Sequence, residues 1–158
     1  FATEGGCVEL VDCTVKNCKE LYGVYVKGKD SSAMLQRTTV MSCQEIGVFV
    51  SEGGTGLLTE CEVREVSMYH GVYTKGRGSS TEIRDCFVHD CQTSCVVVSD
   101  AAKTELVNCD VYGSQRLHGV EVTGEASRVV AEKCRVYDCY QASFVAAQAA
   151  SLTLDGCE

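Results

Sequence analysis

The feature that most restricts the fold of this chain is a sequence repeat of 48 residues. Its three blocks read CTVKNCKELYGVYVKGKDSS, CEVREVSMYHGVYTKGRGSS and CDVYGSQRLHGVEVTGEASR and begin at Cys13, Cys61 and Cys109. Each block divides in two at an equivalent small residue, which is Thr38, Cys86 or Cys134. The steps from Cys13 to Cys157 therefore alternate between 25 and 23 residues. Self-similarity with a fixed period of about 20–50 residues is typical of solenoids, so each half-block is expected to form one coil.

Within a coil, apolar residues alternate with polar ones in three short runs, separated by Gly, Ser, Asp or Asn. The first such runs contain the pairs Val8 and Leu10, Cys13 and Val15, and Val24 and Val26. Alternation with a period of two indicates strands rather than helices. Three strands per coil, paired in parallel with the coils above and below at about 4.8 Å, predict an all-β, right-handed parallel β-helix of about six coils. We treat residues 1–158 as one domain and expect it to be part of a longer solenoid, because neither end carries a cap.

A leucine-rich repeat is the main structural alternative, because Leu58, Cys61 and Val63 have spacings that also occur in that fold. Leucine-rich repeats have one strand per repeat and cover the other side with a helix or irregular turns. Here the segments GVYV, GVFV and GVYT supply a further strand in the place of the helix. The pattern therefore favours the β-helix.

The chain resembles the pectin-lyase-like superfamily of right-handed β-helices, particularly the eukaryotic proteins that carry such repeats beside F-box or signalling-adaptor regions. The resemblance covers essentially the whole chain and rests on the coil pattern in NCDVYGSQRLHGVEVTG and DCTVKNCKELYGVYVKG. It is specific for architecture and leaves two functions open. Some members of the superfamily cleave or epimerise acidic polysaccharides, and others only bind protein partners.

The 12 cysteines form columns rather than the scattered pairs of a disulfide framework. One inward column contains Cys61, Cys86, Cys109, Cys134 and Cys157, and a second contains Cys18, Cys43, Cys91 and Cys139. Equivalent positions in other coils carry Thr, Val or Ser, which indicates a small core residue. We therefore expect a ladder of reduced thiols in a reducing, cytoplasmic compartment, although bridges between adjacent coils would be short enough to form. The spacing of Cys86, Cys91 and Cys95 fits no common zinc pattern, so no metal or other cofactor is expected.

Candidate catalytic groups are few. Glu82 and Glu105 form the only adjacent acidic pair in the outward rows of the first two strands of the coils, and no basic residue lies in their own row. His70 and His118 occupy the place of Tyr22, which favours packing in a turn. His89 is expected in an outward, exposed position, in one row with Met41, Arg64, Tyr112 and Tyr137. No nucleophile triad, phosphate loop or nucleotide motif is present, and the KGRGSS turn is too short to wrap a phosphate. We therefore expect no catalytic site.

The formal charge of −8 disfavours nucleic acid and anionic membranes as partners. No apolar run approaches the roughly 18 residues of a membrane span. Binding of a protein or peptide, with a carbohydrate as the alternative, remains compatible with the composition. Self-association through the ends of the solenoid is also left open.

The third strand of the coils supplies the candidate binding surface. Its outward residues are Phe1, Tyr25, Phe49, Tyr73, Val97, Glu121 and Val145. Four consecutive coils thus present an aromatic ring, and Lys27 and Lys75 lie two residues farther along. An aromatic stripe with a basic edge suits an extended peptide or a sugar chain. The sequence therefore predicts a non-catalytic scaffold that binds through Tyr25, Phe49, Tyr73, Lys27 and Lys75, with a polysaccharide-binding or polysaccharide-modifying β-helix as the alternative.

Overall fold

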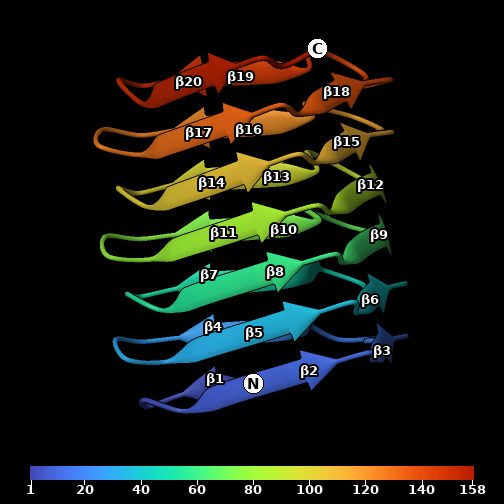
Figure 1. Cartoon of the computed structure of the whole chain (residues 1–158), viewed down its shortest axis with the longest axis vertical. Coiled ribbons are helices and arrows are strands. Elements are labelled where there is room, and N and C mark those ends of the chain that lie inside the picture. The colour runs from blue at the N-terminus through green and yellow to red at the C-terminus, as the bar shows by residue number, and fades with distance from the viewer.

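The computed structural model describes residues 1–158 and contains three parallel sheets that wind around one axis (Figure 1). Sheet A consists of β1 (Ala2–Thr3), β4 (Tyr22–Lys27), β7 (Ile46–Ser51), β10 (Val72–Lys75), β13 (Val96–Ser99), β16 (Val120–Thr123) and β19 (Phe144–Ala147). Sheet B consists of β2 (Cys7–Val11), β5 (Ser32–Gln36), β8 (Thr55–Thr59), β11 (Ser80–Arg84), β14 (Lys103–Val107), β17 (Arg128–Glu132) and β20 (Ser151–Asp155). Sheet C consists of β3 (Thr14–Lys16), β6 (Thr39–Met41), β9 (Glu62–Val66), β12 (Phe87–Cys91), β15 (Asp110–Tyr112) and β18 (Arg135–Tyr137).

Each coil contributes one strand to sheet C, then one to A, then one to B, so that coils 1 to 6 begin at residues 13, 38, 61, 86, 109 and 134. The predicted right-handed parallel β-helix of about six coils is confirmed. Three strands per coil exclude the leucine-rich repeat, which has one. No helix is present that could span a membrane.

The core lies inside the three sheets and contains the inward residues that the alternation predicts. In sheet A these are Val24, Val48, Val72, Val96 and Val120, all buried as expected. Phe144 was predicted in the same row but is only half-buried, because its strand β19 pairs with β16 alone. In sheet B the large core side chains are Leu35, Leu58, Ile83 and Leu106. Successive coils place these residues in register, so apolar side chains stack along the axis.

The corner between sheets B and C explains the main cysteine column. The chain turns there through one residue in the left-handed region, with φ between 47° and 54° at Asp12, Arg37, Glu60, Asp85, Asn108 and Lys133. The next residue points inward and satisfies the carbonyl two positions back. Cys61 Sγ lies 3.2 Å from the Thr59 oxygen, and Thr38 Oγ1 lies 3.0 Å from the Gln36 oxygen. A small side chain with one donor is required here, so Cys and Thr can replace each other.

The turns between sheets A and B account for one of the two residues by which coil lengths alternate, and the connections between sheets C and A account for the other. Coils 1, 3 and 5 have four residues between the two strands, and coils 2, 4 and 6 have three. The longer turns project farther, as the loops at the left edge of Figure 1 show. Each longer turn carries a buried serine whose Oγ accepts a hydrogen bond from a backbone N–H of the preceding short turn. The pairs are Gly5 with Ser31, Gly53 with Ser79 and Ala101 with Ser127. The two-coil repeat thus pairs a short turn with a long one.

Candidate functional site

The predicted aromatic row lies on the outward face of sheet A, in register across coils 1 to 3. Tyr25 pairs with Phe49 and Phe49 with Tyr73 in the parallel ladder. The ring centroids of Tyr25 and Phe49 are 5.1 Å apart at an interplanar angle of 13°, and those of Phe49 and Tyr73 are 5.2 Å apart at 15°. The three rings therefore form one stack parallel to the solenoid axis.

Further rings, three from outside the row and Phe1 from within it, enlarge this stack. Tyr22 meets the Tyr25 ring at 5.0 Å and the Phe49 ring edge-on at 5.0 Å, and His70 meets the Tyr73 ring edge-on at 5.3 Å. Two more rings adjoin the stack: Phe1 lies edge-on to Tyr25, and Tyr69 lies beside His70. We call the surface made by these seven residues the aromatic face: Phe1, Tyr22, Tyr25, Phe49, Tyr69, His70 and Tyr73.

Tyr25, Phe49 and Tyr73 point outward, as predicted. They are half-buried, however, so the prediction that they are exposed is wrong. Both faces of the Phe49 ring are covered by its neighbours in the stack, so this ring has no free face for a sugar or a cation. An aromatic ring carries negative potential on its faces and positive potential at its edge. Phe49 can therefore meet a partner only through its edge.

The predicted basic edge is neutralised within the chain. Lys27 Nζ lies 3.2 Å from a carboxylate oxygen of Glu52, and Lys75 Nζ lies 3.7 Å from one of Asp100, each in the following coil. The hydrogen bond to Glu52 raises the pKa of Lys27. Tyr73 Oη lies 2.9 Å from Ser99 Oγ, at hydrogen-bond distance. The lysines thus border the aromatic face as members of ion pairs rather than as free cations.

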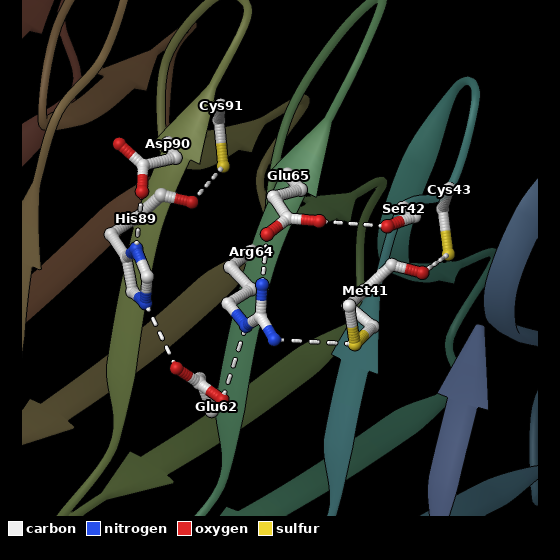
Figure 2. Close-up of polar contacts among 9 residues, drawn as sticks. All are labelled: Met41, Ser42, Cys43, Glu62, Arg64, Glu65, His89, Asp90 and Cys91. Atoms are coloured by element: carbon white, nitrogen blue, oxygen red, sulfur yellow. Dashed lines mark hydrogen bonds and ion pairs between the residues drawn. The ribbon is translucent and has the colours of Figure 1, made fainter. Parts of the chain in front are cut away.

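Sheet C carries a second outward cluster, centred on His89 (Figure 2). Its Nδ1 lies 2.8 Å from Asp90 Oδ2, and its Nε2 lies 3.1 Å from Glu62 Oε1. The ring also stacks on Tyr112 at 4.5 Å, and Tyr112 stacks on Tyr137 at 5.0 Å. His89 was expected to be outward and exposed. It is outward, but these neighbours leave its side chain only 10% exposed.

Arg64 continues this cluster into coil 3. Its Nε lies 3.3 Å from Glu62 Oε2, and a second guanidinium nitrogen binds Glu65, which in turn accepts a hydrogen bond from Ser42 (Figure 2). Both ring nitrogens of His89 lie within hydrogen-bond distance of a carboxylate oxygen. The cluster consists of groups that satisfy one another. Its arrangement suits a structural clamp between coils better than proton transfer to a ligand.

The acidic pair considered for catalysis is adjacent, as the repeat predicts: Glu82 and Glu105 face each other in β11 and β14. Arg84, two residues along β11, forms an ion pair with Glu82. Arg84 belongs to the neighbouring outward row, so it does not appear in the row of Glu82 and Glu105. A carboxylate pair with one member already bound to a guanidinium is not a set of two free acid–base groups.

The cysteines are all free, and no group of three or more His, Cys, Asp or Glu side chains is placed to hold a metal ion. Cys86, Cys91 and Cys95 are buried. Burial raises the pKa of the Cys43 thiol to about 12. The pKa of the Cys86 thiol is also raised, by its hydrogen bond with Cys61 and by burial. A buried thiol that stays protonated is a poor nucleophile and a poor metal ligand.

The three parallel sheets and their stacked coils define the chain as a right-handed parallel β-helix. Residues 22–158 match the family model described as "Right handed beta helix region", and the chain belongs to this family. A comparison with curated proteins finds no match. Among solved structures, pectate lyase Pel9A is similar in fold, with a TM-score of 0.57 and 13% sequence identity. The alignment covers 92% of this chain and 51% of that one, so this chain spans about half the length of the lyase.

Proposed function

We propose that this chain is a non-catalytic β-helix module that binds a protein or peptide partner through the aromatic face. The observation that carries the proposal is the continuity of that face. Seven rings from strands and turns of the first coils touch in sequence, whereas the corresponding row in later coils changes to Val97, Glu121 and Val145. Contiguous apolar surface of this kind is typical of interaction sites.

The rigidity of the sheet also favours binding. Rings that already pack against one another lose little side-chain freedom when a partner covers them, so less of the contact energy is offset by lost entropy. Edges of the inner rings point to solvent, and edge-to-face contact is a favourable geometry for aromatic pairs. A partner that lays an aromatic or proline ring flat across these edges fits best. The free cysteines of the chain also support a location in a reducing compartment, where thiols stay reduced.

Binding or modification of a polysaccharide is the second candidate function. It is favoured by the likeness in fold to pectate lyase Pel9A, but a likeness at 13% identity concerns the fold alone. The polar clusters around His89 and Glu82 are paired internally, so they supply no separate acid and base.

The test is selection of a random twelve-residue peptide library on the immobilised chain, followed by affinity measurements on the selected peptides. Changing Tyr25, Phe49 and Tyr73 together to Ser is expected to weaken binding about a hundredfold or more, because each hot-spot ring contributes more than about 1 kcal/mol. The matched control changes Tyr112 and Tyr137 to Ser in the sheet C stack and should leave affinity unchanged. Circular dichroism checks that both variants keep the fold.

Two results would contradict the proposal. One is equal loss of binding in the sheet A and sheet C variants, and the other is failure of the library to yield any peptide that depends on the aromatic face. Incubation with polygalacturonate, followed by measurement of new chain ends, tests the second candidate. Cleavage of that polymer would replace the proposal.

A further inference from the structure

A recess lies at the turns between sheets A and B, beyond the end of the aromatic face. It forms because the turn of coil 4 has three residues, whereas those of coils 3 and 5 have four. The short turn is thereby set back between two longer ones, a difference that the left edge of Figure 1 shows. The recess has a volume of about 390 Å³ and is lined by the small residues Gly78, Ser80, Ala101 and Ala126 and by the side chains of Arg77 and Lys103.

The charge in this recess is opposite to that of the chain. Its lining includes two cationic residues and no acidic one, in a protein of net charge −8. The nearest acidic positions in the turns that form it are Asp100, which is paired with Lys75, and Glu125, which precedes the lining residue Ala126. Arg77 and Lys103 are exposed and take part in no ion pair or side-chain hydrogen bond, whereas Lys75 beside them is paired with Asp100. Two unpaired cations around a small concave surface are complementary to an anion.

Coil 2 has an equivalent short turn, and it lacks this arrangement. Its flanking long turn in coil 1 contains Lys29 at the place of Arg77, but Asp30 follows directly and adds a carboxylate. Thr55 occupies the place of Lys103 in the ladder of sheet B. The cationic pair is therefore a property of the coil 4 turn and not of the repeat.

We propose that this recess receives an anionic side chain of the same partner that binds the aromatic face. The inference rests on the proposed function and deepens it by naming the chemistry of the partner. Arg77 lies in the turn that directly follows β10, two residues beyond its last residue Lys75, so a partner that covers Tyr73 at the end of the ring stack also reaches the recess. The partner is thus a peptide with aromatic or proline residues and, within a few residues of them, a carboxylate or a phosphoryl group.

The experiment uses the peptide library selected on the unaltered chain. Enriched sequences are expected to carry Asp or Glu at a fixed distance from an aromatic or proline residue. Changing Arg77 and Lys103 together to Gln should weaken these peptides about tenfold or more and should flatten the dependence of affinity on salt. Lys29→Gln is the matched control, because it removes a cation from the equivalent turn position of coil 1 and should change affinity little.

Synthetic versions of one selected peptide distinguish the sources of the anion. They carry Glu, phosphoserine or Asn at the acidic position, and both anionic versions should bind more tightly than the Asn version on the unaltered chain only. If the phosphoserine version binds more tightly than the Glu version, the natural partner is a phosphopeptide. If it does not, the natural partner is an acidic peptide.

Selected peptides without an acidic bias, or equal affinity of the Arg77/Lys103 double variant, would overturn the inference. In that case the loss caused by the Tyr25, Phe49 and Tyr73 variant would still stand, so the proposed function would survive. If neither variant weakens binding, both the inference and the proposed function are wrong. Binding of polygalacturonate that depends on Arg77 and Lys103, with no peptide binding, would overturn the inference in favour of a polysaccharide ligand.

Discussion

The molecule carries two aromatic stacks, one on each of two sheets, and they are built differently. The stack on sheet A joins Tyr25, Phe49 and Tyr73 in coils 1 to 3, and its neighbours are other rings. The stack on sheet C joins His89, Tyr112 and Tyr137 in coils 4 to 6, and its first ring is held between two carboxylates. The same ladder geometry thus produces an apolar surface in one half and a polar clamp in the other.

The difference shows that register alone does not determine whether an outward row forms an apolar surface or a polar cluster. Parallel pairing places equivalent side chains about 4.8 Å apart, close to the separation of stacked rings, so any aromatic column will stack. What distinguishes the two columns is the set of residues that reach them from the turns and from adjacent rows. Rings reach the sheet A column, and charged groups reach the sheet C column.

The largest expected effect on stability separates a polar clamp from an apolar stack. His89→Phe keeps a ring against Tyr112 but removes the partner of Asp90 and one of the two partners of Glu62, which keeps Arg64. Because both carboxylates are partly exposed, the free energy of unfolding should fall by about 1.5 kcal/mol. Tyr73→Phe removes only the hydrogen bond to Ser99 and should cost about 0.5 kcal/mol. Urea unfolding of both variants is the measurement. Equal losses would mean that the carboxylates around His89 are as well solvated without it as with it.

The second prediction concerns the backbone that positions the clamp. Gly113 has φ of +68°, and a Cβ there would lie 2.7 Å from Asp90 Oδ1. Gly113→Ala should therefore move Asp90 away from His89, in addition to the strain of a left-handed alanine. Gly124→Ala is the control, because Gly124 has φ of +88° and nothing closer than 3.4 Å to its Cβ position. We expect Gly113→Ala to be less stable than the control by about 1 kcal/mol, measured by thermal unfolding. A difference near zero would show that Asp90 does not support His89.

The sequence predicted the register of both stacks, because a period of two fixes which residues face outward once one buried position in each strand is known. It did not predict their surroundings. Tyr22 reaches the sheet A stack from the first residue of β4 and His70 from the turn before β10, and the conformation of these turns and strand ends does not follow from the period. The burial of His89 depends on Glu62 in the preceding coil and on a left-handed Asp90, a combination visible only when three outward rows are read together. The recess at Arg77 depends on a difference of one residue between neighbouring turns.

The smallest expected effect tests whether a histidine in the sheet A face behaves as an apolar ring. Burial lowers the pKa of His70, whose Nδ1 lies 2.8 Å from Thr93 Oγ1. The folded protein therefore binds fewer protons at this residue than the unfolded chain does. The free energy of unfolding therefore keeps its full value above the unfolded pKa of about 6.5 and falls as the pH drops below it, because proton binding then favours the unfolded state.

The variant His70→Tyr tests this prediction. It places at this position the residue found at Tyr22 in coil 1, and a tyrosine does not titrate in this range. Unfolding free energies measured between pH 7.5 and about pH 5 should fall less in the variant than in the unaltered chain. An identical pH dependence in the variant would mean that His70 remains solvated, and that the aromatic face is more open than its packing indicates.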